Sequence, residues 1–208
     1  TPMNAIIGFS NFILEEELDF ATKNELKKEI RDNSNYLLTI IGDIMEISQL
    51  ESGNRSITKK EFNLSELLNQ IYEEQLRDCP EMITFQLNDE LAASQVLVNS
   101  DKNIIRQIFE RLLKNAFKFT NRGIIEFGCR FNEKKESYEF YVKDSGIGIS
   151  PENHEEIFEP FHQLNPMVKG TGIGLTICKS HAAMLHSQLK VESVLGKGST
   201  FSFRLRGI

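Results

Sequence analysis

Apolar positions in the first 52 residues recur at helical spacing and predict two helices. The first helix would run from residue 2 to the acidic run at 15–17, with its apolar side chains at Met3, Ile6, Ile7, Ile13 and Leu14. Residues 18–24 are polar enough for a turn, with Thr22 or Asn24 as the predicted N-cap of the second helix.

The second helix carries a heptad repeat, formed by Leu26, Ile30, Asn33, Leu37, Ile40, Ile44 and Ile47. Such a seam is typical of a helix that packs lengthwise in a bundle or a coiled coil. Because two helices have too little area for a closed core, we expect residues 1–53 to form a homodimeric four-helix bundle. The alternative is a hairpin that is buried on its own chain.

Beyond Gly53 the pattern changes, with a predicted linker at 53–60 and mixed helices and strands over 61–208. The predicted helices start at Asn63 or Ser65, at Asp101 and at about 172, and the predicted strands cover 83–87, 96–98, 124–131, 138–142, 188–194 and 199–205. This mixture predicts an α+β layer, with helices on one face of a mostly antiparallel sheet.

Composition excludes several classes of protein. The formal net charge is −6 and no long basic run occurs, which argues against a nucleic-acid partner. No apolar run approaches the roughly 20 residues of a membrane span. The three cysteines are widely spaced, so neither a disulfide framework nor a zinc site is expected, and a reducing cytosol fits. Because Thr1 already lies in a predicted helix, we interpret the chain as a fragment.

A first polar motif lies on the helix that starts at Asp101, in the segment Leu-Leu-Lys-Asn-Ala-Phe-Lys-Phe-Thr. Asn115 and Lys118 are three residues apart, so they share a face, and Thr120 follows. An amide oxygen beside an ammonium group suits a Mg²⁺–phosphate pair, although an ordinary exposed polar face has the same pattern.

A second motif, Asp-Ser-Gly-Ile-Gly-Ile at 144–149, directly follows a predicted strand. A carboxylate on Asp144 could accept a hydrogen bond from an exocyclic amine such as that of adenine. Gly146 and Gly148 would let the backbone approach a flat ring closely. A tight turn that begins with Asp is the competing interpretation.

A third motif, Gly-Thr-Gly-Ile-Gly-Leu at 170–175, opens a predicted helix. Glycines there expose amide N–H groups at a positive helix end, which suits phosphate. The spacing fits neither the dinucleotide fingerprint nor a Walker loop. The three motifs are separated by 29 residues (115 to 144) and by 26 (144 to 170), and together they point to one ligand.

With these motifs the chain resembles the transmitter core of a two-component sensor histidine kinase over essentially its whole length. The matching segments are the N box around Asn115, the G1 box at 144–148, the F box at 157–161, the G2 box at 170–174, a closing hairpin at 196–201 and the tail of the H box at 1–8. The resemblance implies a Bergerat-type α/β sandwich that binds ATP and Mg²⁺.

By the same resemblance, Asn115 would hold Mg²⁺, Lys118 would contact phosphate and Asp144 would bind the adenine amine. The pocket would be shaped by Gly146, Gly148, Gly170, Thr171, Gly172 and Gly174. Residues 148–170 would form a mobile lid that Phe158 and Phe161 anchor.

The function that the resemblance implies is an ATP-dependent protein-histidine kinase. The γ-phosphoryl group would pass to a His, then to an Asp in the receiver domain of a response regulator, in the cytoplasmic part of a membrane-anchored sensor. Two other functions compete with it. One is a silent nucleotide-binding scaffold, and the other is an ATP hydrolase of the same fold.

The chain departs from the family at three places. The phosphoacceptor His would precede Thr1, and Thr1 matches the position that orients water in dephosphorylation of the partner. Arg111 stands where the family usually has Asn and related ATPases have a catalytic Glu, and Glu110 is about 100° away round the helix. His186 and Ser187 replace a common Gly-Gly, so this helix end needs another cap.

Overall fold

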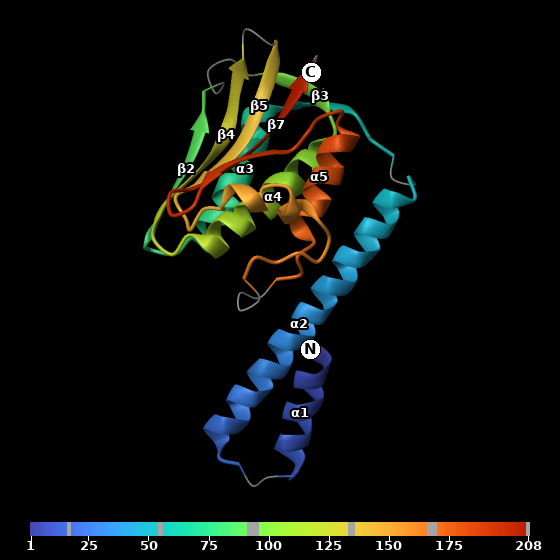
Figure 1. The fold of residues 1–208 in the computed structure, drawn as a ribbon, viewed down its shortest axis with the longest axis vertical. Helices are drawn as coiled ribbons and strands as arrows, with labels where there is room; N and C mark the ends of the chain where they lie inside the picture. The colour runs from blue at the N-terminus through green and yellow to red at the C-terminus, as the bar shows by residue number, and fades with distance from the viewer. Residues whose placement is uncertain (16–17, 54–55, 91–95, 133–135, 166–169, 207–208) are drawn as a thin grey trace. The chain divides into compact units, whose positions relative to one another are not determined.

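A computed structural model describes residues 1–15, 18–53, 56–90, 96–132, 136–165 and 170–206 (Figure 1). The chain divides into two compact units, Thr1–Asn54 and Arg55–Ile208. Each is described by itself. Among the described residues, no helix combines the length and the hydropathy that crossing a membrane requires.

The first unit is a helical hairpin of α1 (Pro2–Glu15) and α2 (Phe20–Glu51). The N-cap of α2 is Asp19, whose Oδ1 accepts hydrogen bonds from the N–H groups of Ala21 (2.8 Å) and Thr22 (3.0 Å). The predicted cap at Thr22 or Asn24 was therefore wrong, because the Asp19 carboxylate satisfies the first free amides of the helix.

The second unit combines three α-helices, two short 3₁₀ helices and seven strands among its described residues. In chain order they are β1 (Lys60–Asn63), α3 (Leu64–Leu76), β2 (Ile83–Asp89), β3 (Leu97–Ser100), α4 (Lys102–Phe119), β4 (Gly123–Asn132), β5 (Ser137–Asp144), η3 (Pro151–Asn153), η4 (Glu156–Phe158), α5 (Gly174–Met184), β6 (Lys190–Val194) and β7 (Gly198–Arg206).

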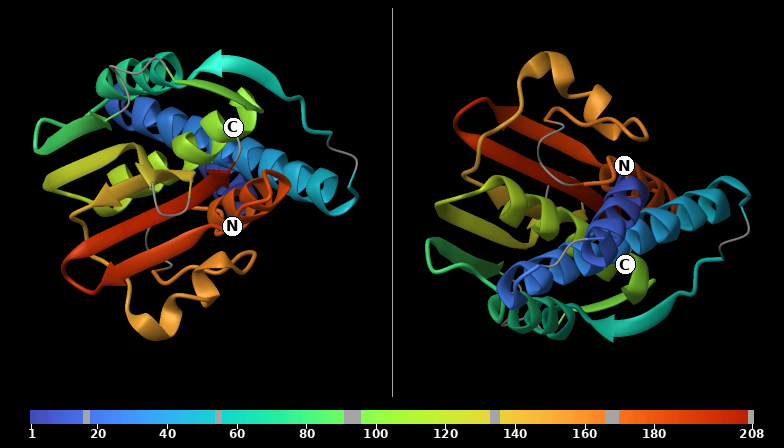
Figure 2. Two further views of the ribbon diagram at one scale, coloured as in Figure 1. Left: turned by 90° about the horizontal axis from the view of Figure 1, so that it is seen from above. Right: turned by 90° about the horizontal axis from the view of Figure 1, so that it is seen from below.

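The main sheet has five strands in the order β2-β4-β5-β7-β6. β2 and β4 run parallel, and the other neighbours are antiparallel. Helices α3, α4 and α5 cover one face of this sheet (Figures 1 and 2). The predicted layer of helices on one face of a mostly antiparallel sheet is confirmed, with one parallel pair added.

The expectation of a linker up to residue 60 was wrong at its end, because β1 begins at Lys60 and pairs with β3 in a separate two-stranded sheet. Lys60 lies opposite Ser100 and Asn63 opposite Leu97. This pairing joins segments that are far apart in sequence. Alternation within four residues is too short a signal to reveal it.

The predicted helix starts at Asn63 and Asp101 are confirmed. The Asn63 side chain accepts a hydrogen bond from Glu66 N, and Asp101 Oδ1 accepts from Asn103 N (3.0 Å). Asp101 Oδ2 also accepts from Thr58 N at 2.8 Å, which ties the segment before β1 to the start of α4.

Aromatic side chains of α4 and the sheet form the centre of the core. Phe140 on β5 and Phe203 on β7 stack with ring centroids 4.9 Å apart. Phe109 on α4 meets both rings edge-on, and all three side chains are fully buried. This packing fixes α4 across β5 and β7, and the C-terminal end of β5 and the N-terminal end of β7 carry residues of the site.

The C-terminal end of α5 explains how the chain replaces the glycines expected there. His186 itself adopts the left-handed conformation, with φ of +56°. Its N–H donates to Ala183 O (2.9 Å), and Ser187 N donates to Ala182 O (2.8 Å). These two bonds are those of a Schellman cap, built here on a residue that carries a Cβ.

Because a left-handed conformation costs a residue with a Cβ about 1 kcal/mol, His186→Gly is expected to stabilise the chain by roughly that amount. Thermal unfolding would show a rise in the melting temperature of a few degrees. His154→Gly is the matched control, since His154 does not have a positive φ. A melting temperature that falls in His186→Gly would contradict this account of the cap.

Candidate nucleotide-binding site

Asp144 is the last residue of β5 and lies inside the sheet, opposite Ile125 of β4 and Ser199 of β7. Its Oδ1 accepts a hydrogen bond from Gly146 N at 2.8 Å. The side chain is buried, and this burial raises the pKa of Asp144, while backbone hydrogen bonds from Gly146 and Ser199 act in the opposite direction. A carboxylate in this setting favours a further hydrogen-bond donor, such as an amine of a ligand.

The loop after Asp144 packs directly against the C-terminal end of α4. Ile147 N donates to Phe119 O at 3.2 Å. A Cβ on Gly146 would collide with that same carbonyl oxygen and would lie 2.8 Å from Thr120 Oγ1. Only glycine fits so close to α4, and the second motif is thereby brought against the first.

Gly148 is required for a different reason. It has φ of +68°, and a Cβ there would collide with Val194 O at the hairpin between β6 and β7. Gly196 N donates to Ile147 O at 2.7 Å and closes the same contact. Both glycines of this motif therefore hold the loop in a fixed path beside Asp144.

Thr120 places an unsatisfied hydroxyl group at this point. Its Oγ1 is buried and has no hydrogen-bond partner among the described residues. Buried hydroxyl groups usually have partners, so an orphaned one next to Asp144 suits a polar ligand. The sequence motif contained Thr120, but its spacing alone assigned no role to this residue.

Asn115 and Lys118 lie half-buried on α4, five and two residues before Thr120. Burial lowers the pKa of Lys118, and the neighbouring positive charge of Lys114 adds to this effect. The Lys118 ammonium also lies 4.9 Å from the centroid of the Phe119 ring. A partly desolvated cation of this kind favours an anionic partner such as phosphate.

Helix α5 offers a second set of donors at its N-terminus. It begins at Gly174, and no side chain caps it, because the N-cap position is occupied by Ile173. The first amide N–H groups of an α-helix have no intrahelical acceptor and attract anions. Gly170, Thr171 and Gly172 precede this end, and Thr171 Oγ1 accepts a hydrogen bond from Ile173 N at 3.3 Å.

The F box lies against this glycine-rich loop. Gly172 has φ of +70°, and a Cβ there would come within 2.7 Å of the carbonyl carbon of Phe161. Thr176 Oγ1 on α5 donates to Phe158 O at 3.0 Å, and the Phe158 ring is buried. Phe158 thus holds the middle of the segment 148–170 against α5, and the role of this segment as a lid stays a prediction.

Phe161 does not act in the same way. Its ring is 64% exposed and its φ is +63°, so the prediction that Phe161 anchors the lid was wrong. Its backbone, and not its ring, makes the contact with Gly172. Residues 166–169 of the predicted lid lie outside the described residues.

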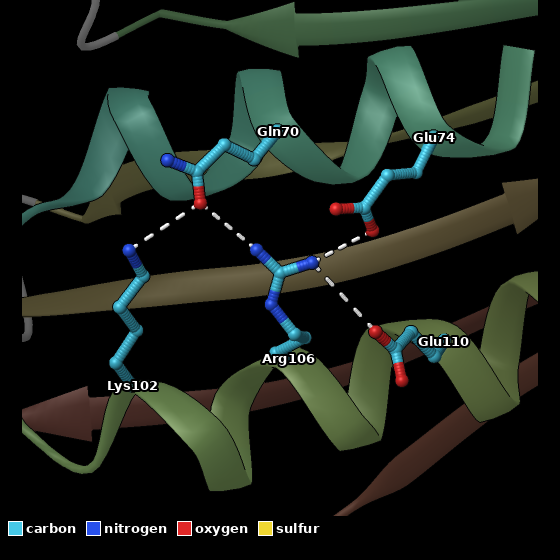
Figure 3. Close-up of polar contacts among 5 residues, drawn as sticks. All are labelled: Gln70, Glu74, Lys102, Arg106 and Glu110. Atoms are coloured by element: carbon cyan, nitrogen blue, oxygen red, sulfur yellow. Dashed lines mark hydrogen bonds and ion pairs between the residues drawn. The ribbon is translucent and has the colours of Figure 1, made fainter.

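Glu110 pairs with Arg106 and is not placed to act as a water-activating base. Figure 3 shows it beside Arg106, with an ion-pair distance of 3.7 Å, while Arg106 also binds Glu74 (2.8 Å) on α3. Arg106 and Lys102 both donate to Gln70 of α3. Glu110 is therefore part of the contact between α3 and α4. Arg111 lies half-buried on α4, one turn before Asn115.

The described residues contain no cluster of three or more His, Cys, Asp or Glu side chains that could hold a metal ion. Mg²⁺ does not need such a cluster, because it commonly keeps water ligands and takes one or two protein oxygens together with substrate phosphates. The amide oxygen of Asn115, on the same helix as Lys118, fits that type of site.

Comparisons with known proteins agree with this geometry. Residues 100–207 match the family model of histidine kinase-, DNA gyrase B- and HSP90-like ATPases. The chain is 34% identical to hybrid signal transduction histidine kinase B of Dictyostelium discoideum, over 99% of the chain and 11% of that protein. It is 32% identical to the sensor histidine kinase RcsC of Escherichia coli, over 99% of the chain and 22% of that protein. The chain therefore spans only a minor part of these relatives.

Two solved structures have a similar fold. Histidine kinase ThkA, in complex with the response regulator protein TrrA, superposes with a TM-score of 0.78 at 26% identity, over 99% of this chain and 57% of that one. Full-length ShkA in complex with AMPPNP gives 0.77 at 23% identity, over 98% and 42% of the two chains. On this sequence and structural evidence, the chain belongs to the family of histidine kinase-, DNA gyrase B- and HSP90-like ATPases, and the two relatives named above are histidine kinases.

Proposed function

We propose that this chain is the ATP-binding and helical core of a protein-histidine kinase. The observation that carries the proposal is that Asp144, Gly146 and Thr120 lie together at one end of the sheet. The N-terminus of α5, which has no side-chain cap, belongs to the helix layer that covers this sheet (Figure 1). A buried carboxylate beside an orphaned hydroxyl suits a purine, and free amide N–H groups suit phosphates.

In this proposal Asp144 accepts a hydrogen bond from the adenine amine, and Gly146 and Gly148 keep the backbone close to the ring. Lys118 and the amide groups at Gly170, Thr171, Gly172 and Gly174 bind phosphate oxygens. Asn115 holds Mg²⁺, which supplies charge neutralisation when it is bound.

The transfer step breaks the bond between the γ-phosphorus and its bridging oxygen, and ADP leaves. A histidine nitrogen forms the new N–P bond and gives up its proton to a base. A response-regulator aspartate receives the phosphoryl group next. The solved complex of ThkA with TrrA supports a receiver domain as partner. The role of Thr1 in dephosphorylation and the cytoplasmic location remain predictions.

The test extends the chain upstream of Thr1 by an H-box segment that contains the acceptor His and measures labelling with γ-³²P-ATP and Mg²⁺. Acid-labile, base-stable label on that His is the expected result, and an Asn115→Ala version should lose it. Tight nucleotide binding without any label would instead favour the silent scaffold.

We also propose that the first unit forms the homodimeric bundle. Helix α1 has 14 residues and α2 has 32, so much of α2 extends past its partner helix. On α2, Leu38, Ile41 and Met45 are 67%, 46% and 58% exposed and recur at helical spacing. Such a stripe is typical of a helix that packs against another copy.

Leu38→Asp is expected to weaken dimerisation by at least about 100-fold, because it places a charge in an apolar interface. Since Leu38 is largely exposed within one chain, folding of the hairpin should be unaffected. Thr39→Asp, which adds the same charge at an exposed position of α2 outside this stripe, is the matched control. Analytical ultracentrifugation measures both, and equal dimer affinities would refute this interface.

A further inference from the structure

A polar groove lies in the Arg55–Ile208 unit, away from the candidate nucleotide-binding site. It has a volume of about 640 Å³ and is bordered by the segment before β1, the end of α5 and the last residues of β7. Asp144 is paired with Ser199 at one end of β5 and β7, whereas Ser137 is paired with Arg206 at the other. The groove therefore lies at the opposite end of the sheet from Asp144, where Figure 1 shows the C-terminal ends of α5 and β7.

The charged side chains of this groove are all cationic. Lys59, Lys190, Arg204 and Arg206 line it, and no Asp or Glu is among the described residues that do so. Arg204 already binds Glu139, with its Nε 2.8 Å from Oε1. Within the described part of the chain, no ion pair joins Lys59, Lys190 or Arg206 to a carboxylate. In a chain of net charge −6, three such cations around one groove favour an anion.

The backbone of β7 also offers a hydrogen-bond donor at this groove. β6 pairs with β7 only over residues 198–202, so the edge of β7 from Phe203 onward lies beside residues 186–188. Ser187 Oγ accepts a hydrogen bond from Arg204 N at 2.9 Å. Because N–H groups on one edge of an antiparallel strand alternate, the N–H of Arg206 lies on that same edge.

The floor of the groove is apolar. Ile57 from the segment before β1 and Met184 at the end of α5 line it with half-buried side chains, over the buried core residues Leu185, Phe203 and Leu205. An apolar floor below a cationic rim fits a ligand with an apolar body and an anionic head. The volume is within the usual range for sites of small organic molecules.

We infer that this groove is a binding site for a small organic phosphate, distinct from the nucleotide site. The phosphate would lie among Lys59, Lys190 and Arg206, and the apolar body would lie on Ile57 and Met184. Since Lys59 and Ile57 belong to the segment that Thr58 N ties to Asp101, a bound ligand would also hold that segment against β7.

The test titrates the chain with 1-naphthyl phosphate and follows its ¹H–¹⁵N NMR spectrum. Saturable shifts are expected at the amides of residues 186–190 and 204–206. Lys190→Gln/Arg206→Gln should weaken binding at least about tenfold, and Lys59→Gln should weaken it less. Lys27→Gln/Arg77→Gln, with the same change of charge at exposed positions, should leave binding unchanged.

Two further titrations distinguish this site from the nucleotide site and test whether binding depends on the phosphate group. Asp144→Asn should bind the probe as the unchanged chain does, so failure of the nucleotide proposal would not affect this one. Neutral 1-naphthol should bind at least about tenfold more weakly. The inference is overturned by equal binding of the naphthol, by shifts confined to residues 115–120 and 144–148, or by no saturation at millimolar probe.

Discussion

Asp144→Asn is expected to lower the affinity for an adenine nucleotide by at least about 100-fold and, at the same time, to stabilise the nucleotide-free chain. Asp144 Oδ1 already accepts the hydrogen bond from Gly146 N. An asparagine would keep its oxygen there and turn its NH₂ group toward the ligand. The adenine amine is also a donor, so the two groups would oppose each other.

The gain in stability follows from the pKa of Asp144, which burial raises. A carboxyl whose pKa is higher in the folded chain than in the unfolded chain favours unfolding once it is ionised. The advantage of Asp144→Asn should therefore be absent at pH values below the ordinary value of 3.8 and grow as the pH rises through the raised pKa. At neutral pH we therefore expect a higher melting temperature for Asp144→Asn than for the original chain.

Calorimetric titration and thermal unfolding measure the two effects on the same sample. Asp78→Asn is the matched control, since Asp78 is exposed just after α3 and the change in charge is the same. Unchanged nucleotide affinity in Asp144→Asn would remove Asp144 from the binding site. Lost affinity with a lowered melting temperature would show that the variant acts through misfolding.

Glu139→Gln is expected to destabilise the chain by about 2 kcal/mol at neutral pH. Glu139 lies on β5, directly opposite Arg130 of β4 and Arg204 of β7. Arg130 Nε donates to Oε2 at 2.7 Å and Arg204 Nε donates to Oε1 at 2.8 Å. Removing the carboxylate would leave the two guanidinium groups facing each other across β5.

We expect a smaller loss of stability than a fully buried set of three paired charges would give. The Glu139 side chain is 6% exposed, but those of Arg130 and Arg204 are 54% and 34% exposed, so water screens part of the attraction. Burial alone would raise the pKa of Glu139, but the hydrogen bonds from Arg130 and Arg204 outweigh it and lower the pKa.

A lowered pKa in the folded chain stabilises it above the ordinary value of 4.5, and this stabilisation is lost as the pH falls through the lowered pKa. Urea unfolding should therefore show a gap between the original chain and Glu139→Gln that is full at pH 7 and shrinks below about pH 4.5. Glu192→Gln, at an exposed position of β6, should show no comparable gap. A constant gap at every pH would mean that the lost stability is not electrostatic.

The parts of the site that the sequence predicted are those that depend on local spacing. Asp144 and Gly146 lie two residues apart at a strand end, and Asn115 and Lys118 lie one turn apart on a helix. In both cases chemistry and geometry are set within a few residues. The lack of a side-chain cap on α5 also follows from the glycine-rich motif that precedes it.

The features that the sequence did not predict depend on segments far apart in the chain. The pairing of β1 with β3 and the ion pairs of Glu139 each require strands whose order is fixed only by the whole sheet. The positive φ and the exposed side chain of Phe161 are likewise not encoded in the F-box pattern. Asp19 as N-cap was missed for a simpler reason, because two other capping residues follow it closely.

The central claim is that the Asp144 end of the sheet binds ATP together with Mg²⁺. The most direct measurement is a calorimetric titration of the folded chain with a non-hydrolysable ATP analogue, with Mg²⁺ and with a chelator. We expect one site per chain, with affinity at least about tenfold higher in Mg²⁺, since phosphate oxygens and Asn115 share the ion. No binding to a chain shown to be folded, or binding that Mg²⁺ does not change, would contradict it.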